Sequence, residues 1–232
     1  MSGRLILLRH GQTHANVEGR LDTRPPGAEL TALGRRQALA FARSGLAAPG
    51  LLVHSVAVRA AQTAAVIAAE AAVAAQELEG VHEVQAGDLE DRTDDDAITH
   101  FKAVYQRWHE GDLDLAMPGG ESGREVLDRY LSAVEGLRAR HLEGPRAGGG
   151  DVLIVSHGSA IRLVAATLAG VDRRFALDRH LANTEAVVLE PVSEGRWNCV
   201  QWGSRTPPFR SVPETQPMAP MAEVLGPGDP MG

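Results

Sequence analysis

Two histidines stand shortly behind apolar runs that have the length of buried strands. His10 and His157 each come two positions after such a run, Leu5 to Leu8 and Val152 to Val155, and Arg9 precedes the first histidine. A glycine follows each histidine, and glycine lets the backbone turn tightly and a ligand approach closely. A neutral imidazole can act as a nucleophile or a base, and an arginine fork matches phosphate oxygens with paired hydrogen bonds. These residue types therefore point to chemistry on an anion.

An arginine and a glutamate follow two further runs. Arg59 lies four residues beyond Ser55, after the run Leu51 to Val53, and Glu83 ends a weaker run that starts at Glu79. In open α/β sheets ligands bind outside the carboxyl ends of the strands, so we expect the four strand ends to share one cleft. Helix N-termini behind the His-Gly pairs would add amide donors. A cationic cluster with a single carboxylate nearby predicts a bound anion, because folding alone would not favour it.

Zinc binding and serine hydrolysis are the competing chemistries. His10, His157 and Glu83 could ligate zinc, but arginines in the same cleft would repel a dication, and no H-E-x-x-H pair occurs. The segment Gly120 to Gly123 is one residue short of the G-x-S-x-G pattern and does not directly follow a strand. We therefore favour an anion site and expect no metal.

The elements that must position these residues alternate along the chain. Short apolar runs followed by longer helical patterns predict an α/β fold in three layers, α/β/α, with a mostly parallel central sheet. Further strands are expected over residues 185–189 and 197–202. Helices are expected over residues 33–44 with Thr31 as cap, 58–75, 94–110, 121–142 and 159–169.

Composition excludes several classes of function. The 232 residues fit one domain or at most two, and a net charge of −7 argues against nucleic acid or an anionic membrane as partner. The single lysine, Lys102, stands in no P-loop, and the single cysteine, Cys199, rules out an intramolecular disulfide framework. Without a signal-peptide pattern or a long apolar stretch, we expect a soluble cytoplasmic protein with no membrane association. Residues 204–232 hold 7 of the 13 prolines and are expected to form a disordered or surface-draped tail.

The motifs resemble those of the histidine phosphatase superfamily, in its phosphoglycerate mutase-like branch. The similarity runs in order from about Arg4 to Leu189. It implies a histidine phosphatase domain over residues 1–203 with a cap insertion at about 89–120. The motifs are LRHGQT from Leu8 with Asn16 beyond it, SVAVRAAQTA from Ser55, Glu83 ahead of Gly87, GGES from Gly119, and VSHG from Val155.

The resemblance also implies a role for each site residue. His10 would be the nucleophile and become a phosphohistidine, while Glu83 would protonate the leaving oxygen and later deprotonate a water. The ligand would be a small-molecule phosphomonoester, with no cofactor, and the relatives make a homodimer through a sheet edge an option. Four side chains would hold the phosphoryl oxygens: Arg9, Asn16, Arg59 and His157.

The sequence departs from the family pattern at Asp22, at His14 and in the third motif, where Gly87 to Asp91 replace the common Gly-x-Trp-Glu-Gly. Asp22 stands where the family often has a glutamine close to the phosphate, and a carboxylate there disfavours a dianion unless it is paired. The sequence leaves three options open. Asp22 points away, pairs with Arg20 or Arg24, or selects a substrate that carries a hydrogen-bond donor.

Three functions fit the motifs to different degrees. A 2,3-bisphosphoglycerate-dependent mutase needs extra basic residues for a second phosphate and a carboxylate. Between Leu89 and Gly120 the basic side chains Arg92, Lys102 and Arg107 stand singly among aspartates, so a phosphatase is favoured. A phospho-ligand binding module with little turnover is disfavoured, because every expected catalytic position is filled. The sequence leaves the substrate open.

Overall fold

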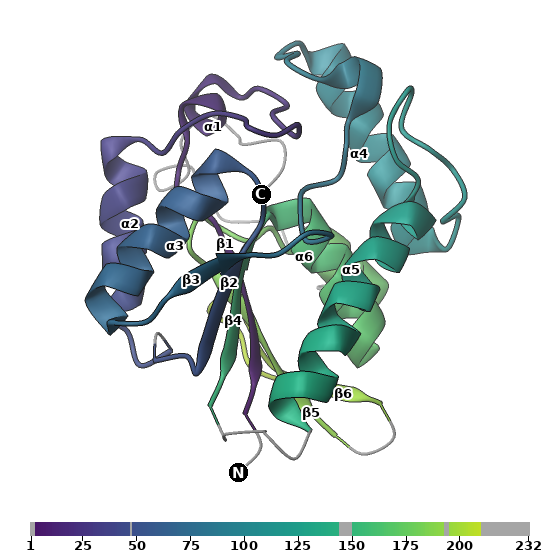
Figure 1. Cartoon of the computed structure of the whole chain (residues 1–232). Coiled ribbons are helices and arrows are strands. Elements are labelled where there is room, and N and C mark those ends of the chain that lie inside the picture. The colour runs from purple at the N-terminus through teal and green to yellow at the C-terminus, as the bar shows by residue number, and fades with distance from the viewer. Residues whose placement is uncertain (1–2, 47, 144–149, 193–194, 210–232) are drawn as a thin grey trace.

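A six-stranded sheet with the order β3-β2-β4-β1-β5-β6 forms the centre of the molecule (Figure 1). The computed structural model describes residues 3–46, 48–143, 150–192 and 195–209. The first four strands of that order run parallel, and β5 and β6 are antiparallel to their neighbours, which confirms the mostly parallel sheet. The strands are β1 (Leu5–Arg9), β2 (Leu51–His54), β3 (Ala75–Glu77), β4 (Val152–Ser156), β5 (Ala186–Pro191) and β6 (Trp197–Trp202).

Helices cover both faces of the sheet and complete the predicted three layers (Figure 1). Side chains of β1 alternate between the faces: Ile6 and Leu8 share a core with α2 and α3, and Leu5 and Leu7 share one with α5 and α6. Burial on both faces explains why this strand is apolar throughout. The four helices are α2 (Ala32–Ala42), α3 (Val58–Ala71), α5 (Gly123–Leu137) and α6 (Gly158–Ala169).

The long connection between β3 and α5 carries α4 (Asp95–Glu110), which lies beyond the carboxyl ends of the strands (Figure 1). Asp94 caps this helix by accepting a hydrogen bond from the Ala97 amide. Tyr105 Oη donates to the carbonyl of Ser159 at 2.8 Å and so ties α4 to the first turn of α6. This connection thus lies at the same end of the sheet as the predicted site, and the role of residues 89–120 as a cap that selects the substrate stays a prediction.

The third strand was predicted at the wrong place. Residues 79–83 are irregular, and the strand is instead β3, which pairs with β2 at the edge of the sheet. The helix predicted to reach Ala75 ends at Ala71, where Ala72 adopts a left-handed φ of 54°. Alanine favours a helix locally, but the pairing of β3 with β2 overrides that preference.

Three further differences are local. The predicted helix 121–142 ends at Leu137 and continues as a π-helical turn, Arg138–Leu142. The two short helices α1 (His14–Glu18) and α7 (Arg173–Asp178) were not predicted. A hydrogen-bonding side chain begins each of them, Thr13 for α1 and Asp172 for α7.

The predicted tail falls largely outside the described residues. Within 204–209, Phe209 lies against Phe175 with ring centroids 5.3 Å apart, so this part packs on the domain. Residues 210–232 lie outside the described residues. Among the described helices, none has both the length and the apolar character to cross a membrane.

Candidate active site

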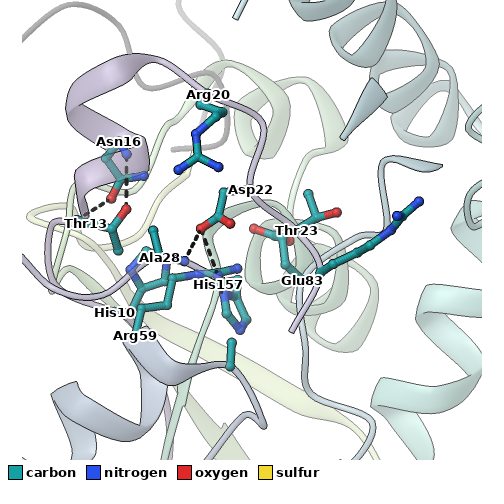
Figure 2. A network of polar contacts seen from close by, with 12 residues as sticks. His10, Thr13, Asn16, Arg20, Asp22, Thr23, Ala28, Arg59, Glu83 and His157 are labelled. Atoms are coloured by element: carbon teal, nitrogen blue, oxygen red, sulfur yellow. Dashed lines mark hydrogen bonds and ion pairs between the residues drawn. The ribbon is translucent and has the colours of Figure 1, made fainter. Parts of the chain in front are cut away.

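The carboxyl ends of β1, β2 and β4 meet because these strands are neighbours in the sheet. A narrow polar cavity lies at this edge, and Figure 2 shows most of the side chains around it. Five of the six predicted site residues line the cavity, and the sixth, His157, lies behind Arg59. The lining residues are Arg9, His10, Thr13, Asn16, Arg20, Asp22, Arg59 and Glu83.

His10 is buried, with 4% of its surface exposed, and its ring is held in one tautomer. Nδ1 lies 2.8 Å from the carbonyl oxygen of Gly11, which can only accept, so Nδ1 carries the proton and Nε2 is bare. Burial, and then the positive charges of Arg59 and Arg9, hold the pKa of His10 well below its usual 6.5. Arg9 is buried beside it, and its Nη1 donates to the carbonyl of Leu181 at 2.5 Å. The imidazole is therefore neutral at neutral pH and suited to attack an electrophile.

Arg59 reaches into the cavity from the first turn of α3. Its Nε donates to Nδ1 of His157 at 3.2 Å, and its Nη1 donates to Oδ2 of Asp22 at 3.2 Å. The backbone of Gly27 passes so close that an added Cβ would lie 2.3 Å from Nη1, and its φ of 70° also favours glycine. The guanidinium is thus fixed in place and buried, which is how an arginine binds an oxyanion without further reorganisation.

His157 has protein partners on both ring nitrogens. Because Nδ1 accepts from Arg59, the proton sits on Nε2, which donates to Oγ of Ser55 at 2.8 Å. Burial and the nearby Arg59 hold the pKa of His157 well below 6.5, so this ring is neutral as well. Its centroid lies 5.2 Å from that of His10. Ser55 belongs to one of the motifs but was not predicted as a site residue. Its position directly after β2 is the signal that could have identified it.

Asn16 lines the cavity from α1. Its Oδ1 accepts from the amide of Thr13 at 3.0 Å and from Nδ2 of Asn183 at 3.2 Å, which orients its own Nδ2 as a donor. Asn183 also donates to the carbonyl of His10 at 3.1 Å. The sequence did not predict Asn183, because it is remote in the chain and belongs to none of the five motifs.

Glu83 is 1% exposed and stands on the irregular segment that follows β3. Its carboxylate accepts from three backbone amides, those of Val84 (2.8 Å), Ala160 (2.9 Å) and Ser159 (3.2 Å). Two N-terminal amides of α6 therefore donate to Glu83, whereas the sequence had predicted that they would donate to the bound anion. Burial raises the pKa of Glu83, although these hydrogen bonds oppose the rise.

The contacts of Asp22 differ from two expectations drawn from the sequence. Its Oδ2 accepts from the amide of Ala28 at 3.0 Å and from Arg59, so it points into the cavity and its partner is neither Arg20 nor Arg24 (Figure 2). The cationic cluster therefore has a second carboxylate beside it, not Glu83 alone as expected. Arg20 stands at the rim and binds Glu18 and Asp91 instead.

The lining of the cavity contains three arginines and two carboxylates. In the part of the chain that the structure describes, no group of three or more His, Cys, Asp or Glu side chains could hold a metal ion. The positive charge at this site comes from Arg9, Arg59 and the rim residue Arg20. This arrangement is chemically suited to an oxyanion such as a phosphoryl group.

A comparison with protein families decides the assignment. The model of the histidine phosphatase superfamily (branch 1) matches residues 5–205 of the chain. The chain belongs to this superfamily. The matched range contains every predicted site residue and ends close to the expected domain boundary at residue 203.

Relatives of this histidine phosphatase occur among curated proteins and solved structures. Glucosyl-3-phosphoglycerate phosphatase of Mycobacterium tuberculosis H37Rv is 34% identical over 175 residues, 71% of this chain and 74% of that protein. The PE-PGRS family protein PE_PGRS11 of the same strain is 32% identical over 84% of this chain, which spans only 35% of that longer protein. A structure of mycobacterial glucosyl-3-phosphoglycerate phosphatase with VO3 superposes with a TM-score of 0.74 and 29% identity, covering 88% of this chain and 100% of that one. The fold is thus that of the phosphoglycerate mutase-like histidine phosphatases.

Proposed function

We propose that the protein is a metal-independent phosphatase that hydrolyses a small phosphorylated metabolite through a phosphohistidine on His10. The observation that carries this proposal is the bare Nε2 of a neutral His10 in a cavity lined by Arg9, Arg59 and Glu83. Phosphatase relatives, among them the glucosyl-3-phosphoglycerate phosphatases, support a phosphoric monoester hydrolase with a substrate of this class.

In the first step Nε2 of His10 attacks the phosphorus atom of the ester. The P–N bond forms as the P–O bond to the alcohol breaks, and the leaving oxygen takes the proton from the Glu83 carboxyl. Arg9 and Arg59 hold the phosphoryl oxygens, where charge accumulates in the transition state. His157 orients Arg59 through Nδ1, and its own contact with a phosphoryl oxygen, like that of Asn16, stays a prediction.

In the second step water hydrolyses the phosphohistidine. The Glu83 carboxylate, now deprotonated, takes a proton from the water, whose oxygen bonds to phosphorus as the P–N bond breaks. Inorganic phosphate leaves, His10 is neutral again and Glu83 is protonated for the next turnover. General acid and base help of this kind contributes about 10²- to 10⁴-fold.

Two basic residues of the predicted cap, residues 89–120, favour a phosphatase over a mutase. Arg92 pairs with Asp94 at 2.6 Å and Arg107 pairs with Asp112 at 2.7 Å, so neither is poised to hold a second phosphate. Cytoplasmic location, a homodimer, and the tail boundary at residue 204 stay predictions.

Release of phosphate from 4-nitrophenyl phosphate in excess EDTA tests the proposed function. We expect the wild-type protein to release phosphate at the same rate with and without EDTA. Loss of activity in EDTA would show that the cavity works with a metal. Binding of inorganic phosphate with no turnover of any phosphomonoester would favour the binding module.

We expect activity to fall at high pH, where Glu83 loses its proton, and at low pH, where His10 gains one. An acid must hold its proton, so kcat/KM for an alkyl phosphate falls as pH rises through the Glu83 pKa, which lies above 4.5. A nucleophile must be neutral, so activity falls as pH drops through the His10 pKa, which lies well below 6.5. Glu83→Gln should remove the limb at high pH and keep the limb at low pH. A profile of Glu83→Gln that still shows both limbs would exclude Glu83 as the acid.

Asp22→Asn is expected to tighten the binding of inorganic phosphate. The substitution removes a carboxylate that competes with phosphate for Nη1 of Arg59, and we expect a dissociation constant about tenfold lower, which is ~1.4 kcal/mol. Titration calorimetry measures the effect, with the exposed Asp128→Asn on α5 as the matched control. An unchanged constant in Asp22→Asn would contradict this competition.

A further inference from the structure

The segment that carries Glu83 lacks the hydrogen bonds of a strand. Residues 79–83 were predicted to be extended in the sheet, yet they pair with none of the strands in the described part of the chain. Three of their backbone carbonyls are bound by one side chain, Arg129 of α5. It donates to the carbonyl oxygens of Gly80 (2.8 Å), His82 (2.9 Å) and Glu83 (3.0 Å). The carbonyl of Val81 accepts from Oγ of Ser156, and that of Glu83 accepts also from Nε2 of Gln85.

A second charged residue fixes Arg129 from the other side. Glu121, from the GGES motif, accepts Nε and Nη2 of Arg129 at 2.7 and 2.8 Å in a bidentate pair. The same carboxylate accepts the backbone amide of Gln85 at 3.0 Å. The two side chains are only 16% and 18% exposed, which shields the pair from water. The ion pair therefore holds the backbone on both sides of Glu83.

We propose that Arg129, locked by Glu121, is the positioning residue that sets the Glu83 carboxyl at the leaving oxygen. The inference rests on the proposed function of Glu83 as the acid. Proton transfer requires hydrogen-bond reach, and a misplacement of about 1 Å can cost about 100-fold in rate. Arg129 uses a planar fork to reach three carbonyls and a carboxylate at once, whereas the single ammonium of a lysine cannot satisfy the same set.

A positioning role has a kinetic signature that a loss of folded protein does not have. A nitrophenol leaves as a stable anion and hardly needs the acid, whereas an alkanol needs a proton as it leaves. Misplacing Glu83 should therefore slow alkyl phosphates much more than aryl phosphates. The ratio kcat/KM reports the steps up to release of the alcohol, and a smaller fraction of folded enzyme lowers it equally for both substrates.

The experiment measures kcat/KM of wild type, Arg129→Lys and Glu121→Gln with glycerol 3-phosphate or another reactive alkyl phosphate, and with 4-nitrophenyl phosphate. We expect Arg129→Lys to lower the alkyl value about 10- to 100-fold and the aryl value by no more than about threefold. Glu121→Gln should show the same preference to a smaller extent. Arg124→Lys is the matched control, since Arg124 lies on the same helix in an exposed pair with Asp114.

A double variant separates action through Glu83 from an independent effect. If Arg129 acts through Glu83, adding Arg129→Lys to Glu83→Gln should cause no further loss with the alkyl phosphate. Equal losses on both substrates, or multiplied losses in the double variant, would overturn the inference. If Glu83→Gln itself leaves the alkyl-to-aryl ratio unchanged, the proposed function of Glu83 fails first, and the two failures are thus distinguishable.

Discussion

His10→Ala should lower kcat/KM for phosphate release by about 10⁴-fold or more, because it removes the atom that bonds to phosphorus. The cavity keeps its arginines, so inorganic phosphate should still bind to the variant. Continuous phosphate release from 4-nitrophenyl phosphate measures the rate, and titration calorimetry measures the binding. Intact binding together with lost turnover would locate the defect in the chemical step.

The control for this substitution is His100→Ala, which removes an exposed imidazole from α4. It should leave kcat/KM unchanged. His10→Asn is a second test, because it keeps a polar side chain in the buried position. Turnover in either His10 variant within tenfold of wild type would exclude His10 as the nucleophile.

Arg59→Lys should lower kcat/KM by about 10³-fold, the order expected for an arginine that stabilises a transferring phosphoryl group. The guanidinium contacts His157 and Asp22 while facing the cavity, and an ammonium cannot make both contacts and also bind two phosphoryl oxygens. Unlike His10→Ala, this variant should also bind inorganic phosphate more weakly. Steady-state kinetics with both substrates and calorimetry with phosphate check the two parts.

Arg43→Lys is the matched control for Arg59→Lys, because Arg43 pairs with Glu70 on the exposed surface. Its kcat/KM should equal that of wild type. Thermal unfolding of both variants verifies that the fold is kept. If Arg59→Lys retained wild-type turnover and phosphate affinity, the oxyanion would have to lie elsewhere.

The sequence predicts the framework of the site well because the framework depends on local patterns. The apolar runs ending near Arg9, His54 and Val155 are strands, and parallel pairing brings their carboxyl ends together. The capping residue Thr31 and the end of the helix predicted over residues 159–169 were also predicted correctly, since the signal for each lies within or next to its own helix. Fold and family follow from these local features and their order.

The contacts that tune the site could not be read from the sequence. Asp22 meets Arg59, and Asn183 meets Asn16, across long stretches of chain, so no spacing rule indicates either pair. Arg129 supports the Glu83 segment from a helix that has its own amphipathic pattern, in which an arginine looks like a solvated residue. Such contacts arise only when the layers pack, and they set the charge and geometry on which the proposed chemistry depends.

The most direct test of the account is a burst experiment with Glu83→Gln and 4-nitrophenyl phosphate. This substrate needs little acid for the first step, but hydrolysis of the phosphohistidine lacks its base, so the phosphoenzyme should accumulate. The account predicts a rapid burst of one nitrophenol per protein molecule, with the phosphoryl group mapped to His10 by peptide mass spectrometry. No burst, or a phosphoryl group on another residue, would contradict a phosphohistidine mechanism at His10.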